Sequence, residues 1–481
     1  MPGLRVRKNN VREKPQRNNA FFYSTVTFCA LLFALIINKD IEIPTWFSIF
    51  VGSVGFFVLL FKGLNKPEIP FYALVAYLPF NKTLSGTFGG FMTALNLTNI
   101  LILLVIFCLV VHGMSNKSKI FEHNGLNWLI FLFCLLGIFS VMRGGFYYGS
   151  RYLMEFIIPL KRWLTPVFLY FVAFNIIRNK VILKKTIIIL MIVVAIAGLM
   201  AMKEGIDLGD AGSLDSSRVG GLAQQPNMMG AFFVYYMFLF LGFFYLNWSK
   251  IKSWWLLVPF LICFRGIQVT YSRGAIMAFA FGLVAITFLK NKFLFIIMCL
   301  GVIFALLNPQ FLPGGMRYAI DRTKGGEQMY ESSAIEDNID VSAATRIEIW
   351  KGAIQMIKDN PVWGVGYGVF PYAIPMYVGG IGERDAHNTY LIIATEMGIP
   401  VLIVFLLIIF VLFRNTFWLF TRVEDPFIKA VALGMLGGLA GMIVANMFGS
   451  RLESEEVSAY LWILAGLIIR AVLMKKRKEI D

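Results

Sequence analysis

The sequence is poor in charge: only 15% of its 481 residues are charged, and it holds three histidines and five cysteines. A typical soluble domain is about 25% charged, so this composition excludes an ordinary string of soluble domains. The cysteines show no metal-ligand spacing and all lie in apolar runs, so we predict no disulfide and no metal site. They are Cys29, Cys108, Cys134, Cys263 and Cys299.

What the chain has instead is apolar sequence, at 58% hydrophobic residues. Most of its apolar runs are long enough to cross a hydrocarbon core of roughly 30 Å. We therefore predict an all-α polytopic membrane protein with about 12 to 14 transmembrane helices and one long, partly helical periplasmic loop. The expected spans are 20–38, 46–62, 68–80, 97–113, 126–142, 162–177, 184–202, 229–247, 254–270, 274–290, 292–308, 388–413, 427–449 and 457–474.

The formal net charge of +16 would favour nucleic-acid binding in a soluble protein. In a membrane protein, basic loops mark the cytoplasmic side, so we predict no nucleic-acid partner. Alternate loops are basic, from "RVRKNNVREKPQR" to "MKKRKEID", which places both termini in the cytoplasm. The N-terminus has no convincing cleavage site and is interpreted as a signal anchor.

The domain organisation follows from this topology. It comprises a basic cytoplasmic N-terminus (1–19), a membrane bundle of about eleven spans with an outer loop at 203–228 (20–308), a long periplasmic loop (309–387), C-terminal spans (388–474) and a basic tail (475–481). Within the long loop, "TRIEIWKGAIQMIKDNP" predicts an amphipathic helix on the membrane surface or over the bundle. Its expected apolar face is Ile347, Trp350, Ile354 and Ile357.

Four cationic or titratable side chains stand out on the outer side. Arg273 lies in a tight turn between two spans, Arg218 precedes a span whose start carries Asn227, and Arg346 begins the amphipathic helix. His387 is the one histidine predicted outside. Each has an ordinary alternative: a lipid-headgroup anchor, a loop or surface arginine, or a structural histidine. Together they indicate an anion-binding site.

Two charges are expected inside the membrane, where they need a structural or functional reason. Glu396 follows His387 in the same expected span, and we favour a structural ion pair or hydrogen bond for it. Arg265, Gln268 and Ser272 are expected to form a polar stripe that faces the bundle interior, with Arg265 as a candidate partner for Glu396.

The chemistry of these residues narrows the ligand class. The chain has no GxxxxGK[ST] pattern, no pair of acids typical of a metal site and no Ser-His-Asp order. Arginines bind phosphates and diphosphates in planar, bidentate fashion. A neutral histidine beside them can remove a proton from an incoming hydroxyl.

The motifs occur in a familiar order: "RVGGLAQQPN", then "YSRGA", then "RIEIWKGA" with "NPVWGVGYGVF", and last "AHNTYL" with "EMG". This order, over about 215–415, resembles the O-antigen ligase and polymerase superfamily of bacterial envelope enzymes. The resemblance implies transfer of a glycan from an undecaprenyl-diphosphate carrier to an acceptor hydroxyl, with inversion and without a metal or cofactor.

By this resemblance His387 matches the catalytic histidine, and Arg273 and Arg346 match the arginines that contact the diphosphate. Arg218 matches a frequent but less certain diphosphate position. The supporting residues are Asn388, Tyr390, Trp350, Asn227, Glu396 and Arg265.

The resemblance leaves the acceptor open. A ligase uses the lipid A core, a polymerase uses another carrier-linked glycan, and related enzymes use a protein hydroxyl. We expect a bacterial inner-membrane protein with its active site on the periplasmic side, and a flippase and a chain-length regulator are candidate partners.

Two other functions remain as alternatives. Some members of this superfamily have been described as bicarbonate transporters, so a small-solute or anion transporter is the main one. Transporters usually show broken helices, paired polar residues at mid-membrane and inverted repeats. No repeat is visible, and Arg265 with Glu396 is the one hint of such a pair. A purely structural assembly protein is the other alternative.

Overall fold

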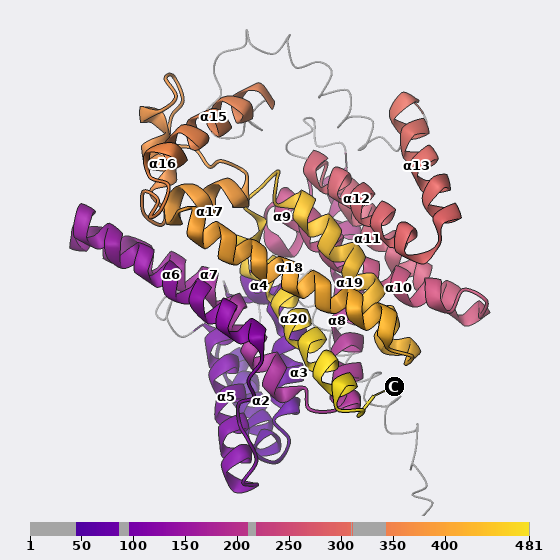
Figure 1. Ribbon diagram of the computed structural model, residues 1–481. Coiled ribbons are helices and arrows are strands. Elements are labelled where there is room, and N and C mark those ends of the chain that lie inside the picture. The colour runs from indigo at the N-terminus through magenta and orange to yellow at the C-terminus, as the bar shows by residue number, and fades with distance from the viewer. Residues whose placement is uncertain (1–44, 86–95, 210–217, 309, 311–342, 481) are drawn as a thin grey trace, which may run out of the picture. The chain divides into compact units, whose positions relative to one another are not determined.

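The apolar runs form helices, and no strand occurs among the residues that the computed structural model describes, which are 45–85, 96–209, 218–308, 310 and 343–480. Nine helical segments in these ranges are long and apolar enough to cross a membrane. They are Leu97–Ser115 (α5), Gly125–Tyr148 (α6), Ser150–Ile176 (α7), Lys180–Leu208 (α8), Pro226–Leu246 (α9 and α10), Arg273–Lys290 (α12), Ile399–Arg422 (α18), Pro426–Ala445 (α19) and Glu455–Lys476 (α20). The chain is an all-α polytopic membrane protein (Figure 1).

The remaining described α-helices lie outside these nine segments. They are Thr45–Asn65 (α2), Glu68–Tyr77 (α3), Asn81–Ser85 (α4), Leu257–Val269 (α11), Lys292–Leu307 (α13), Ala343–Asp359 (α15), Phe370–Ala373 (α16) and Thr389–Met397 (α17). The 13 residues of α11 extend about 20 Å at 1.5 Å per residue, and a 3-10 helix over Ile251–Leu256 runs directly into it. The expected span at 20–38 lies outside the described residues.

The single span expected over 388–413 is two helices. Gly398 separates α17 from α18 and has a φ of +94°, a conformation that favours glycine. A Cβ at this position would overlap the carbonyl oxygen of Val362, and the next backbone N–H, of Ile399, donates to Pro361 at 2.8 Å. The loop before α16 therefore packs directly against the break, and the apolar span begins at Ile399.

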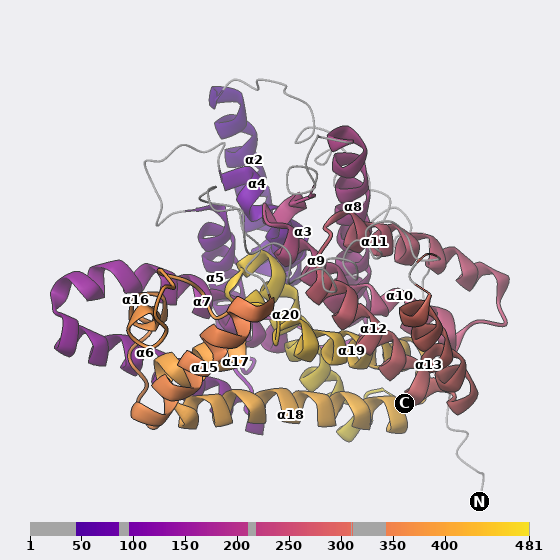
Figure 2. The same ribbon diagram turned by 90° about the horizontal axis from the view of Figure 1, so that it is seen from above.

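The most buried of these segments are α9–α10, α19 and α20. α19 packs against α12, and α20 packs against α7 (Figures 1 and 2). Glycines let α19 approach α9 and α10 closely. A Cβ at Gly434 would lie 2.6 Å from the Cα of Leu239, and a Cβ at Gly438 would overlap the carbonyl oxygen of Tyr235. Such small residues are the usual means by which membrane helices pack at short distance.

Ion pairs fix the start of α19 and the end of α20, which together form the open end of the α19–α20 hairpin. Glu122, in the loop between α5 and α6, contacts Arg470 and Arg477 at 2.9 Å each. Lys180, at the start of α8, contacts Asp425 at 2.5 Å. These pairs hold the open end of the α19–α20 hairpin against neighbouring segments.

The amphipathic helix of the long loop forms as expected, as α15, but its buried face differs from the expected one. Ile349, Ala353 and Met356 are fully buried against α16 and α17. Ile347 and Ile354, both expected on the apolar face, are 51% and 48% exposed. The reason is that α15 packs on both α17 and the rest of its own loop, and these contacts determine which stripe of the helix is buried.

Replacing Gly438 with valine tests the close approach of α19. We expect Gly438→Val to lower the melting temperature of the purified protein sharply, because overpacking a tight core typically costs about 1–3 kcal/mol or more. Gly301→Val is the matched control, since a Cβ at Gly301 in α13 meets nothing within 4 Å. Equal melting temperatures for the two variants would contradict this packing.

Candidate active site

His387 lies just before α17, in a backbone conformation that is uncommon for its residue type. Its φ is +49°, in the left-handed region. The next residue, Asn388, caps α17 by accepting the backbone N–H groups of Tyr390 and Leu391 at 3.0 and 3.1 Å. The helix start thus fixes where the histidine stands, at the edge of the bundle and with 31% of its side chain exposed.

Asp385 is the direct partner of this histidine. Its Oδ2 lies 3.1 Å from Nδ1 of His387. The hydroxyl of Ser450 donates to both carboxylate oxygens at 3.1 Å. Burial raises the pKa of the Asp385 carboxyl, but the hydrogen bonds and positive charge of His387, together with the bond from Ser450, outweigh it and hold this pKa below its usual value.

Arg346 stands on α15, whose position relative to His387 is set by Trp350. The indole N–H of Trp350 donates to the carbonyl oxygen of Ala386 at 2.9 Å. Arg346 lies one helical turn before Trp350, or about 6 Å along the axis. The contact therefore ties the arginine-bearing end of α15 to the residue that precedes His387.

Arg218 contacts the turn between α11 and α12, which is followed directly by Arg273. Arg218 donates from Nε to the carbonyl oxygen of Thr270 at 3.1 Å and from Nη2 to Asn227 at 3.1 Å. Arg273 is the first residue of α12, directly after Ser272, whose hydroxyl caps that helix. Arg218, Asn227 and the turn that carries Arg273 therefore lie together in the fold.

The loop 446–454 between α19 and α20 contacts the segments that carry these groups. On one side, Thr389 of α17 donates from its backbone N–H to the carbonyl oxygen of Asn446 at 2.9 Å and from its hydroxyl to the amide oxygen at 2.8 Å. On the other side, the Phe448 ring lies 6.4 Å from that of Trp350. A Cβ added at Gly274 would be 3.1 Å from the Cβ of Phe448. This loop brings the segments of His387, Arg273 and Arg346 together.

Sequence reasoning missed two residues near His387, one of which, Arg451, lies in this loop. Arg451 is only 5% exposed, and it donates to the carbonyl oxygen of Phe448 at 3.0 Å. The acids dominate the sequence "SRLESEE", but an arginine among them in a predicted outer loop could have marked this position as a candidate site residue. Asp385 has a weaker signal: its spacing of two residues from His387 becomes meaningful only once the backbone turn is known.

Glu396 and Arg265 do not form the ion pair considered from sequence. Arg265 is exposed and donates to Gln268 at 3.2 Å, so the expected inward polar stripe is incomplete. Glu396 is 4% exposed and accepts the backbone N–H of Phe370 at 3.2 Å. Its backbone carbonyl accepts the N–H of Gly366 at 3.0 Å. Glu396 therefore anchors the glycine-rich segment before α16.

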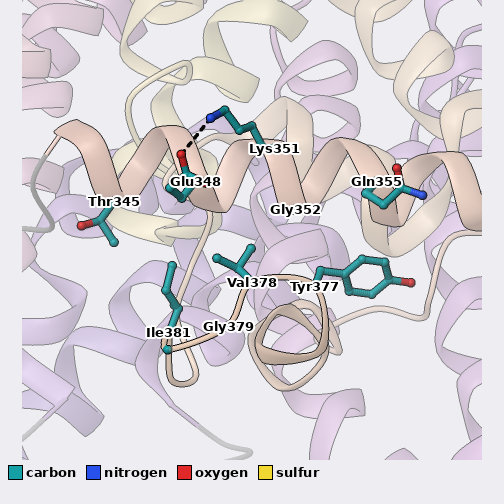
Figure 3. A pocket seen from close by; sticks show the side chains of 10 residues that line it. Thr345, Glu348, Lys351, Gly352, Gln355, Tyr377, Val378, Gly379 and Ile381 are labelled. Carbon is teal, nitrogen blue, oxygen red and sulfur yellow. Dashed lines mark hydrogen bonds and ion pairs between the residues drawn. The ribbon is translucent and has the colours of Figure 1, made fainter.

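A polar cavity of about 600 Å³ lies beside α15, outside this cluster (Figure 3). One wall is the α15 stripe of Thr345, Glu348, Gly352 and Gln355, and the opposite wall is the 377–381 loop with Tyr377. Glu348 pairs with Lys351 at 2.8 Å, which leaves the pair without net charge. Such a lining is suited to a hydroxyl-rich ligand more than to a phosphate.

The buried Glu396 carboxyl predicts a pH-dependent stability. Burial raises the pKa of this group to about 8, with the nearby Asp385 charge acting the same way and N–H donors of Gly368 and Phe370 opposing it. A pKa raised in the folded state means that stability is complete below pH 4.5 and declines as pH rises toward 8. We expect Glu396→Gln to remove this decline, so its melting temperature exceeds that of wild type more at pH 8 than at pH 4.5. A constant difference across pH would contradict the assignment.

Part of the chain matches a known protein family. Residues 258–406 match the model of a family described as O-Antigen ligase. The matched segment includes Arg273, Arg346, Asp385 and His387, and it ends before the 446–454 loop. No curated protein matches the chain. Residues 258–406 are therefore similar to the O-antigen ligase family, in agreement with the resemblance given by the sequence motifs.

Proposed function

We propose that this protein is a glycosyltransferase of the bacterial inner membrane. It transfers a glycan from an undecaprenyl-diphosphate carrier to an acceptor hydroxyl on the periplasmic face, as an O-antigen or exopolysaccharide polymerase or as an O-antigen ligase. The observation that carries the proposal is that one loop, 446–454, joins the segments of His387, Arg273 and Arg346. The family match of residues 258–406 supports the same reaction class.

In this mechanism His387 is the general base. Its Nε2 accepts the proton of the acceptor hydroxyl while the acceptor oxygen attacks C1 of the donor sugar. The bond from C1 to the carrier diphosphate breaks, and the diphosphate leaves with the electron pair. Direct displacement inverts C1, and positioned base catalysis of this kind contributes ~10²–10⁴ in rate.

The arginines stabilise the leaving group. Negative charge grows on the diphosphate as the C1–O bond breaks, and guanidinium groups bind such oxygens in bidentate fashion. Arg273 begins α12, so the N-terminal end of that helix dipole adds to its positive charge. Arg218 supports the same turn through Thr270, and we propose that the reaction needs no metal or cofactor.

The remaining parts of the substrates have suitable surroundings. The carrier tail would lie in the bilayer against exposed apolar helix surface. The sugars would extend from the diphosphate into the polar cavity beside α15, because Thr345 lines this cavity and directly precedes Arg346. Transport is the less supported alternative: the described Arg265 and Glu396 do not pair, and the grouped polar residues lie where helices end.

Complementation tests the function. We expect His387→Ala, returned to a deletion strain at wild-type membrane abundance, to abolish transfer because the base is missing. His123→Ala is the matched control, since this exposed histidine stacks on Trp128 in another loop. Surface glycans and carrier-linked intermediates are measured together.

The intermediate identifies the reaction. Long carrier-linked glycan that never reaches lipid A identifies a ligase, and single carrier-linked repeat units identify a polymerase. Normal glycans in the deletion strain and in the His387→Ala strain would overturn the enzymatic proposal and favour transport.

Arg273→Lys tests bidentate recognition, because lysine keeps the charge but loses the planar fork. We expect the transfer rate to fall by ~10²–10³, the typical effect of losing one transition-state contact. Arg414→Lys, at an exposed position on α18 about four turns from its start, is the control. Near-normal activity of Arg273→Lys would count against direct contact with the diphosphate.

A further inference from the structure

The side chain of Asp385 makes two contacts with the residue proposed as the base. Its carboxylate lies 3.1 Å from Nδ1 of His387, and it also accepts the backbone N–H of His387. An aspartate that bonds the backbone two residues ahead forms an Asx turn. Here the turn coincides with the left-handed φ of +49° at His387, so one side chain holds both the backbone and the ring of this histidine.

Asp385 is itself held in place by the loop 446–454. Ser450, which is 4% exposed, donates to both of its carboxylate oxygens at 3.1 Å. Ser450 contacts both carboxylate oxygens and His387 contacts one of them, so the contacts run Ser450–Asp385–His387. The serine in this chain is therefore a support for the carboxylate and does not take the place of a nucleophile.

We propose that Asp385, supported by Ser450, is the positioning residue for His387, keeping its proton on Nδ1 and its free electron pair on Nε2. The proposal rests on the function proposed above. In a neutral imidazole one nitrogen donates and the other accepts, and the partner of the first decides which. A carboxylate at Nδ1 also stabilises the imidazolium that forms when Nε2 takes the acceptor proton.

Asp385 and His387 form a dyad, and other charged side chains lie on four elements that pack around it. They are Arg273 on α12, Arg346 on α15, Glu396 on α17, and Arg451 and Glu453 in the loop 446–454. Glu396 and Glu453 both interact electrostatically with Asp385. Asp385 is distinguished from these carboxylates by its direct contact with the ring of His387.

The first test is the pH profile of transfer by purified full-length protein, with carrier-linked glycan extracted from the host. Asp385→Asn keeps the size of the side chain and an oxygen for the Asx turn but loses the charge. We expect kcat to fall at least ~10²-fold with little change in KM, less than the ~10⁴-fold loss for a fully buried triad aspartate, because Asp385 is partly exposed.

The same variant should move the acidic limb of the kcat/KM profile to lower pH, because the imidazolium loses a stabilising charge. A purely structural role would lower the rate equally at every pH without moving this limb. Glu383→Gln, an exposed carboxylate in the same loop, is the matched control and should leave rate and profile unchanged. Ser450→Ala should produce a smaller loss in the same direction.

The second test is independent of activity. The chain has three histidines, so ¹⁵N-histidine NMR is simple enough to assign the His387 signal from its loss in His387→Gln. We expect wild type at pH 8 to carry the proton on Nδ1, and Asp385→Asn to shift toward the Nε2-protonated form. A wild-type signal with the proton on Nε2, or an unmoved pH limb in a folded Asp385→Asn, would overturn the positioning role.

The two proposals fail in different ways. Full activity of His387→Ala would overturn the proposed function, whatever the tautomer of wild type. An inactive His387→Ala beside a fully active Asp385→Asn would leave the function in place and remove the positioning role alone.

Discussion

Two hydrogen bonds between Thr389 and Asn446 set the geometry on which the candidate active site depends. They join the first turn of α17 to the end of α19 through backbone and side chain at once. His387 lies two residues before one partner, and Ser450 lies four residues after the other. A shift of one residue in this pairing would separate Ser450 from Asp385 and move Phe448 away from Trp350. The dyad and the arginine-bearing segments therefore share one point of attachment.

This attachment is polar, although it lies inside an apolar bundle. Asn446 is fully buried, and its amide nitrogen donates to the hydroxyl of Tyr235 at 2.6 Å and to the carbonyl oxygen of Met442 at 2.9 Å. Its amide oxygen accepts from Thr389. A buried amide with its partners satisfied favours one arrangement strongly, because any alternative leaves a polar group without water or a partner. Burial of Asn446 within the protein therefore restrains the arrangement of the segments around it.

Much of this architecture could be predicted from sequence, because apolar length and basic loops reflect the bilayer directly. Arg218 and Arg273 were also within reach, since each lies beside a helix start on one predicted face, and the structure joins them through Thr270. The role of Glu396 could not be predicted from sequence, because its partners are backbone N–H groups at and just before the start of α16. Backbone donors leave no signature in a side-chain pattern.

Asp385 and Arg451 illustrate a different limit of sequence reasoning. Asp385 reaches the ring of His387 through a local backbone turn, and the φ of +49° that permits it cannot be inferred from residue type. Arg451 lies more than sixty positions further along the chain, in a loop that its acids made look like ordinary solvent-exposed sequence. For α15, apolar spacing predicted the helix correctly but not its buried face. Contacts with the surrounding segments determine that face, and Ile347 and Ile354 are exposed.

The ion pairs at the far end of α19 and α20 have a mechanical consequence. The 20 residues of α19 extend roughly 30 Å, from Asp425 paired with Lys180 to the loop that supports His387. α20 returns alongside it, and Arg470 in its last two turns pairs with Glu122. The hairpin is held at its open end by these charge pairs, and the groups proposed for catalysis lie near its loop end. On the proposed function, the alignment of these groups depends on ion pairs at the opposite end of two long helices.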